Sequence, residues 1–455
     1  MNKSELMGSE KLGKLLIKFS LPAVVGMLVN AIYNIVDRIF IGNVIGYMGI
    51  AGITIGFPVM LIMMGFGMLV GFGGTSLVSI KLGEGKKEEA DKIISNSFMI
   101  FLFFSLIITI LGLIFLTPML SFFGASEEVM PYAQQYLQII LLGTFFQFLS
   151  FGMNNFVRGE GNPKIAMGTM LIGAVLNIIL DTLFIVVLKM GIRGAALATI
   201  ISMFVSAVWV MKYFFSIKCV LKITLKNMIP DFPVIKNIFA LGFPVFSMQM
   251  VGSIIVILFN NRLMIHGGEI AVSALGIVHS ISMFILMPVL GIKQGVQPII
   301  GFNYGAKKYD RVKRSLYLAI FSAMIIGIFG LLLTRFFGNA IISIFSRNDQ
   351  DLINTGVQAM NYFMLMLPLV GFQIIGSNHF QAIGKPKQAM LLSLSRQALL
   401  LIPLLIILPN FFGLMGIWMA IPIADFFSSL LTFSFLFFEM RLMKEKEKKL
   451  LKSNI

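Results

Sequence analysis

The sequence predicts an all-α integral membrane protein whose twelve transmembrane helices form two six-helix bundles. Three observations lead to this fold class. Hydrophobic residues make up 58% of the 455 residues and charged residues only 12%, about half the share found in soluble domains. Apolar runs long enough to cross a hydrocarbon core of about 30 Å recur along the whole chain. Motifs of the first half return in the second half, 220 to 225 residues later.

Polar breaks divide the chain into the twelve predicted spans. They cover approximately residues 15–40, 50–80, 92–117, 131–158, 164–188, 192–216, 234–262, 270–301, 312–337, 355–382, 388–409 and 415–440. The N-terminus, the loops after even-numbered spans and the C-terminal tail hold 28 of the 36 lysines and arginines, whereas the opposite loops hold 5. Because lysine and arginine accumulate in cytoplasmic loops, we expect a multi-pass protein of the plasma membrane with both termini in the cytoplasm.

The internal repeat divides the spans into two groups of six. "GEGNPKIAM" (159–167) matches "AIGKPKQAM" (382–390), and "MGIRGAALA" (190–198) matches "FGLMGIWMA" (412–420). A unit with an even number of helices inserts twice in the same orientation, which gives a pseudo-twofold axis along the membrane normal and a central cleft between the bundles. The predicted parts are an N-terminal lobe (1–217), a cytoplasmic linker (218–233), a C-terminal lobe (234–440) and a basic cytoplasmic tail (441–455).

Several classes of function are disfavoured by what the sequence contains. Its one cysteine, Cys219, excludes an intrachain disulfide and a cysteine metal cluster, and its three histidines are widely separated. No phosphate-binding loop and no HExxH or GxSxG motif occurs, so we expect neither an enzyme nor a cofactor. The net charge of +16 follows from the loop asymmetry, which points to anionic lipid rather than nucleic acid as the partner.

Two aspartates of the N-terminal half lie inside predicted spans, where a charge costs roughly 2.5–3.5 kcal/mol. Asp37 lies about 9 Å from the outer end of its helix, and Asp181 about 12 Å from the outer end of its own. Thr199 lies at a similar depth, and Tyr33 and Asn177 each precede an aspartate by four residues and share its helical face. These groups suit either a shared proton or a sodium ion held by the two acids, Asn177 and Thr199. The alternative for Asp37 is a local pair with its neighbour Arg38, which the 100° between adjacent helical residues disfavours.

The C-terminal half lacks both acids. Asn261 stands where the repeat would place Asp37, and Leu404 stands where it would place Asp181. We therefore expect ion coupling in the N-terminal lobe alone. Arg396 and Asp425, inside the last two spans, are predicted to form a structural ion pair, because pairing offsets the cost of each charge.

The sequence resembles the multidrug and toxic compound extrusion (MATE) family. The resemblance rests on "GIKQGVQPIIGFNYGAKK" (291–308), on "RGEGNPK" (158–164) and on the twelve-span, six-plus-six length. It covers essentially the whole chain and is greatest to bacterial drug exporters whose coupling acids lie in the N-terminal half. It implies a V-shaped, two-lobed antiporter that expels organic cations in exchange for protons or sodium ions. The match to the family's ion site comprises Tyr33, Asp37, Asn177, Asp181 and Thr199, with Pro22 at a helix-bending position.

Further polar residues are candidates for substrate contact. Glu160, at the cytoplasmic end of the fourth span, is a candidate for gating or inward-side binding, against a surface ion pair with Arg158 or Lys164. Glutamines at 249, 294 and 297 are candidates for lining the cleft, and methionines and phenylalanines there suit flat aromatic compounds. Lys293 departs from this pattern, because a buried cation does not suit a cavity for cationic drugs. We expect a monomer.

Three other functions agree less well with the sequence. A flippase for lipid-linked saccharides would have more than twelve spans or a strongly cationic cavity, at which only Lys293 and Arg396 hint. A membrane-embedded enzyme would show a catalytic motif in its spans. A channel is disfavoured by the duplicated, glycine-rich bundles, which favour rocking over a static pore.

Overall fold

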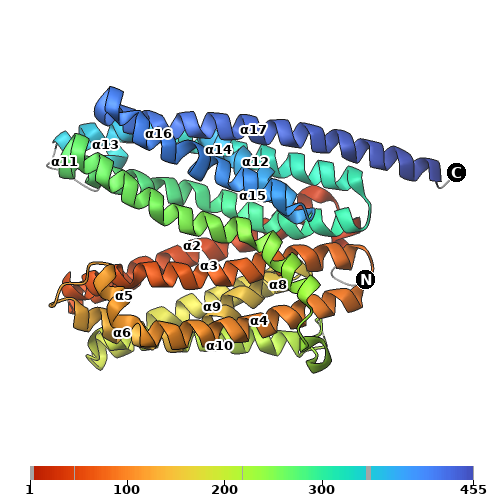
Figure 1. Ribbon diagram of the computed structural model, residues 1–455, viewed down its shortest axis with the longest axis horizontal. Coiled ribbons are helices and arrows are strands. Elements are labelled where there is room, and N and C mark those ends of the chain that lie inside the picture. Colours follow the sequence, from red (N-terminus) through yellow and green to blue (C-terminus); the bar gives the residue numbers. More distant parts are fainter. Residues whose placement is uncertain (1–4, 46, 218, 345–349, 454–455) are drawn as a thin grey trace.

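The computed structural model describes residues 5–45, 47–217, 219–344 and 350–453, which are almost entirely helical. Within these ranges ten helices are long and apolar enough to cross a membrane, and the number rises to twelve when each of two sharply bent pairs counts as one span. Figure 1 shows the helices running side by side in two groups. We call α2–α10 the N-terminal lobe and α11–α17 the C-terminal lobe.

The first half begins with the short helix α1 (Leu6–Ser9) and continues through the helices of the N-terminal lobe. These are α2 (Leu12–Val44), α3 (Tyr47–Gly83), α4 (Lys87–Ile114), α5 (Leu116–Phe122), α6 (Met130–Leu142), α7 (Thr144–Gln147), the π-helical η1 (Phe148–Gly152), α8 (Met153–Gly159), α9 (Pro163–Asp181), the π-helical η2 (Thr182–Val187) and α10 (Gly191–Phe214). The predicted fourth span is bent by 59° at Gly143, between α6 and α7.

The second half begins with a 3₁₀ turn, η3 (Leu225–Met228), in the linker. It continues with α11 (Phe232–Gly305), α12 (Tyr309–Ser343), α13 (Gln350–Phe363), α14 (Leu367–Ala382), α15 (Pro386–Leu394), the π-helical η4 (Ser395–Leu401), α16 (Ile402–Ile407) and α17 (Pro409–Ser453). The predicted tenth span is also bent, by 46° between α13 and α14.

Two breaks in the second half are shorter than the sequence suggests. The predicted loop after the seventh span is reduced to Gly268, whose φ of 65° lets α11 leave and resume helical geometry within one residue. Gly413 (φ 53°) does the same at the start of α17. The predicted tail is not a separate segment: α17 continues through it to Ser453, and Glu447 of this extension pairs with Lys313 at 2.6 Å. Residues 1–4, 46, 218, 345–349 and 454–455 of the predicted parts lie outside the described ranges.

The two lobes meet backbone to backbone near the end that carries both chain termini, which we call the terminal end (Figure 1). A Cβ placed on Gly83 of α3 would lie 2.0 Å from the carbonyl oxygen of Phe302, and one placed on Gly305 of α11 would lie 2.0 Å from that of Ile80. Gly83 and Gly305 are 222 positions apart in the sequence, and so are Ile80 and Phe302. Each helix therefore makes the same contact with the other. This geometry is that of a pseudo-twofold axis between the halves.

A second contact of the same kind lies deeper in the bundle. A Cβ on Gly73 of α3 would lie 2.0 Å from the Ile238 carbonyl oxygen, and one on Gly242 would lie 1.7 Å from that of Leu69. The part of α11 that follows its break packs equally closely on α2, where Gly295 faces Ser20. Glycine is required at these places because any side chain would hold the helices apart. We call this set of contacts the seam.

Candidate ion-coupling site and the seam between the lobes

The two aspartates predicted in the N-terminal lobe lie near each other in space. Asp37, on α2, is half-buried, and Asp181, the last residue of α9, is fully buried. Their carboxylates are close enough for their charges to interact. Within the described part of the chain, neither oxygen of Asp181 has a hydrogen-bond donor. Two nearby acids, of which Asp181 accepts no hydrogen bond from the described residues, favour a state in which a proton or a cation removes part of their charge.

The backbone around Asp181 departs from regular α-helix. Asp181 ends α9, and the π-helical segment η2 follows at once. Wider π-helical turns interrupt the regular hydrogen-bond ladder and recur at functional sites in other proteins. The wider turn therefore begins at the acid itself.

Asn177 and Thr199 complete the polar group expected from the sequence. Both are buried, and Asn177 Nδ2 lies 3.5 Å from Thr199 Oγ1. The Thr199 hydroxyl donates to the Ala195 carbonyl at 3.0 Å, so its lone pairs stay directed to the site. The Asn177 Oδ1 atom has no donor among the described residues. Tyr33 is half-buried on α2, one turn before Asp37.

Tyr136 belongs to this site and was missed by the sequence reasoning. It lies on α6, is 2% exposed, and interacts electrostatically with Asp37, Tyr33 and Asp181 and through hydrogen bonding with Thr199. Its place in the fourth span was the available signal, because a tyrosine hydroxyl buried in an apolar span needs a polar partner. The site thus draws on α2, α6, α9 and α10.

The site brings together several oxygen acceptors, namely the carboxylates of Asp37 and Asp181, the amide oxygen of Asn177 and the hydroxyl of Thr199. Carboxylate, amide and hydroxyl oxygens are the ligands that hard cations prefer, so the group fits sodium as well as a proton. No cluster of three or more histidine, cysteine, aspartate or glutamate side chains suited to a metal ion is found in the described ranges.

Pro22 lies inside α2, which is continuous from Leu12 to Val44. Its neighbours make the seam contacts of this helix, since Ser20 faces Gly295 and Val24 faces Gly291. Proline lacks the amide that would bond one turn back, so the helix is weakened at this point. A change of bend at Pro22 would therefore act directly on the seam.

Glu160 is fully buried and forms hydrogen bonds with the backbone of the linker (218–233). Its Oε2 atom accepts from the backbone amides of Val220 and Leu221, both at 3.2 Å, and lies 3.1 Å from Cys219 Sγ. Its Oε1 atom accepts from the Tyr213 hydroxyl. Burial raises the pKa of Glu160 to about 7, although these donors partly offset the effect. Glu160 therefore forms no surface ion pair of the kind weighed from the sequence.

The three candidate glutamines lie on α11. Gln294 accepts from Arg158 Nη1 at 2.6 Å, and Gln297 Nε2 donates to Ser76 Oγ at 2.7 Å. Both bonds cross the seam. Gln249 is half-buried on the first part of the helix. Two of the three thus join the lobes in this conformation.

Arg396 and Asp425 lie together in the C-terminal lobe. Arg396 Nε lies 2.5 Å from Asp425 Oδ1, and Asp425 is 2% exposed. Arg396 belongs to the π-helical segment η4 and Asp425 to α17. The two charges neutralise each other between neighbouring helices.

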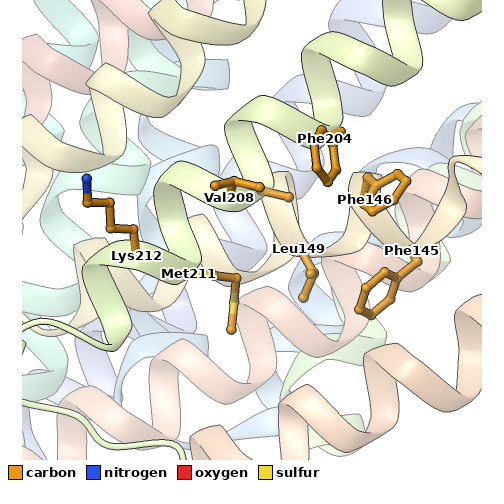
Figure 2. A pocket seen from close by; sticks show the side chains of 8 residues that line it. Phe145, Phe146, Leu149, Phe204, Val208, Met211 and Lys212 are labelled. Carbon is orange, nitrogen blue, oxygen red and sulfur yellow. The ribbon is translucent and has the colours of Figure 1, made fainter.

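A surface pocket lies apart from these groups, between the fourth-span helices and α10. Figure 2 shows three phenylalanines, Leu149, Val208 and Met211 around it, with Lys212 at its margin. None of the predicted site residues lines it. Its walls are apolar, and Phe204 and Val208 are 46% and 49% exposed, so it belongs to the outer surface of the lobe.

Comparison with known proteins gives consistent matches. The MatE family model matches residues 22–183 and 241–407. The chain is 30% identical over 413 residues to the multidrug export protein MepA of Staphylococcus haemolyticus and 31% identical over 412 residues to that of Staphylococcus saprophyticus, with 90% of each chain covered in both cases.

Solved structures match over nearly the whole length. One is the outward-facing conformation of a multidrug resistance MATE family transporter of the MOP superfamily (TM-score 0.91, 26% identity, 98% of this chain and 99% of that chain). Another is a MATE protein in a bent conformation (TM-score 0.92, 26% identity, the same coverage). A third is a MOP superfamily transporter from Pyrococcus furiosus, described as having a binding pocket of reverse polarity (TM-score 0.91, 26% identity, the same coverage). The predicted fold class is confirmed.

Proposed function

Because the chain belongs to the multidrug and toxic compound extrusion (MATE) family of efflux transporters, we propose that it is a secondary antiporter. It exports amphiphilic, mostly cationic and aromatic compounds in exchange for protons or sodium ions, by alternating access. The observation that carries the proposal is the pair of interacting aspartates, Asp37 and Asp181, beside the amide oxygen of Asn177; neither this oxygen nor Asp181 has a donor among the described residues. A transporter coupled to a cation needs a negative charge in the protein that the bound ion can neutralise.

The coupling step follows from the charge of the site. With both acids ionised, their repulsion keeps α2 and α9 apart and the site open to an entering cation. A proton or a sodium ion shared by the acids, Asn177 and Thr199 removes that repulsion. The helices then pack more closely, and the space left for substrate in the N-terminal lobe becomes smaller.

Pro22 links this step to the seam. Asp37 and Pro22 lie on the same helix, and Ser20 and Val24 flank the proline where α2 meets α11. Bending at Pro22 when the acids are neutralised would shift these contacts and change which end of the bundle is closed. The bend of α2 is thus one element with two states, which both the ion and the substrate can reach. The ion shifts the equilibrium between these two states.

Glu160 is the gating candidate at the terminal end. It fastens the linker to the N-terminal lobe through Val220 and Leu221, and the linker leads directly into α11. The bonds that Gln294 and Gln297 make across the seam must break when the terminal end opens. Gln249 and these two glutamines are then free to contact a substrate.

The alternative, a flippase for lipid-linked saccharides, is favoured by one observation. Arg158 and Lys293 place two cations at the seam, where a drug cation would be repelled and a lipid phosphate attracted. Twelve spans and the multidrug export relatives favour the exporter. We also propose that both termini are cytoplasmic, that the protein acts as a monomer and that it needs no cofactor besides the coupling ion.

The test is transport by the purified protein in proteoliposomes loaded with ethidium. An imposed proton gradient and an imposed sodium gradient are applied separately, each with the membrane potential clamped. Efflux driven by at least one gradient is the expected result, and it identifies the coupling ion. Efflux that proceeds only down the ethidium gradient, and is unaffected by either ion, would contradict antiport.

A further inference from the structure

Two cations lie at the seam without an acidic partner in the part of the chain that the structure describes. Arg158, at the end of α8 in the N-terminal lobe, is 7% exposed. Lys293, on α11 in the C-terminal lobe, is half-buried. Among the described residues no aspartate or glutamate lies within ion-pair distance of either side chain.

Their surroundings are polar but neutral. The Arg158 guanidinium donates to Gln294 at 2.6 Å and to Asn155 Oδ1 at 3.2 Å, and it contacts Met170 Sδ at 3.2 Å. The Lys293 ammonium lies 5.9 Å from the centre of the Phe72 ring. Because Lys293 and Gln294 are consecutive, the two cations belong to one region of the seam.

The packing of the fold does not require either charge. At the offset of 222 residues that relates the reciprocal contacts Gly83 and Gly305, Lys293 corresponds to Gly71. The match of 159–167 with 382–390 places Gln381 at the repeat position of Arg158. The same helix positions are thus filled in the other lobe by two uncharged residues, a glycine and a glutamine. Two cations that are largely removed from water, with no acidic partner among the described residues, carry a large desolvation cost, which points to a ligand that offsets this cost.

We propose that the seam binds the acidic group, a carboxylate or a phosphate, of the compound that the protein exports. The inference rests on the proposed function and changes its substrate class: the exported amphiphiles carry an acidic group, either alone or beside a cationic one. Guanidinium presents parallel donors that fit a carboxylate or a phosphate, and an ammonium adds a point charge. Phe72, Met170 and Met27, which lies 4.0 Å from Gln294, offer adaptable apolar contact to the rest of such a compound.

The location of the two cations ties binding to the transport cycle. Arg158 moves with the N-terminal lobe and Lys293 with the C-terminal lobe, so one acidic group contacts both only when the lobes are close together. The acid takes over the Arg158 donor that now bonds Gln294. A ligand with such differential contacts shifts the equilibrium between conformations.

The experiment compares two dyes that differ by one methyl group. Rhodamine 110 carries a free carboxylate, and rhodamine 123 is its methyl ester. Binding of each dye to the purified protein in detergent is followed by fluorescence polarisation for the wild type, Lys293→Gln, Lys293→Arg and Lys212→Gln. The last variant removes an exposed cation of α10, away from the seam, and is the matched control.

We expect the wild type to bind the acid at least tenfold more tightly than the ester. Lys293→Gln should abolish this preference with little change for the ester, whereas Lys293→Arg and Lys212→Gln should keep it. Displacement of rhodamine 110 by farnesyl phosphate but not by farnesol would assign the same site to a lipid phosphate. A wild type without preference for the acid, or a Lys293→Gln protein that keeps it, would overturn the inference.

The proposed function is tested separately in the same preparation. Proteoliposomes receive the two dyes under the gradient that drives ethidium. If the acid binds preferentially but no gradient drives export, antiport fails and the binding site stands. If the gradient drives the ester and the acid alike and binding shows no preference, antiport stands and the acid site fails.

Discussion

Gly242 offers the most direct way to open the seam without touching a charge. A Cβ at this position would lie 1.7 Å from the carbonyl oxygen of Leu69, an atom of the facing helix backbone that cannot turn away. Gly242→Ala therefore requires α3 and α11 to separate by roughly 1 Å or more. Overpacking of this kind costs about 1–3 kcal/mol. The conformation in which the terminal end is closed should lose population by about 5- to 150-fold relative to the open one.

The assay is the distance between the lobes at that end. Spin labels at Lys87→Cys and Asp310→Cys, two exposed positions at the starts of α4 and α12, report it in a protein without Cys219. Gly242→Ala should shift the distance distribution to longer values. Gly252→Ala, on the same helix with nothing within 4 Å of the added Cβ, should not. An unchanged distribution in Gly242→Ala would refute the role of backbone contact in closure.

Three further predictions concern the ion pair, the linker and the orientation. Asp425→Asn should destabilise the protein by about 3–5 kcal/mol in thermal unfolding, because it leaves the charge of Arg396 uncompensated. Adding Arg396→Gln should recover part of this loss. A fully stable Asp425→Asn variant would exclude a structural ion pair. Burial raises the pKa of Glu160 from 4.5 to about 7, so its neutral form favours linker packing. Amide-exchange protection of residues 219–221, corrected for intrinsic rates, should therefore fall as the pH rises from 4.5 to about 7 and stay level above that. Glu160→Gln should remove this dependence, and its persistence would exclude Glu160 as the cause. Ser126→Cys, in the exposed loop after α5, should react with an impermeant maleimide on intact cells; reaction only after permeabilisation would reverse the predicted orientation.

Much of the fold was predictable because each membrane span can be recognised from its own stretch of sequence. An apolar run between polar breaks shows in the sequence, and so does a repeat as explicit as 159–167 with 382–390. The bends at Gly143 and between α13 and α14 were not predictable, since both halves of each bent span are apolar. The reduction of a loop to Gly268 depends on a backbone conformation that composition does not reveal.

The site was predictable to the extent that its members lie at equal depth. Asp37, Asp181 and Thr199 could be placed on one level by counting from span ends, and the structure brings them together. Tyr136 could not be found in this way, because its role depends on which face of α6 turns toward the aspartates. The contact of Glu160 with the linker joins residues 60 positions apart and follows from tertiary packing alone.

The central claim is that the negative charge of Asp37 couples ion entry to export. The decisive measurement is ethidium efflux from proteoliposomes under the driving ion gradient, for wild type, Asp37→Asn, Asp181→Asn and Asn261→Ala. The asparagine variants keep the size of each side chain and remove its charge, so both should reach near-normal yield and lose gradient-driven efflux. Asn261→Ala, at the repeat position of Asp37, should retain it. If Asp37→Asn still expels ethidium against its concentration gradient, the charge of Asp37 is not the coupling element and this account is wrong.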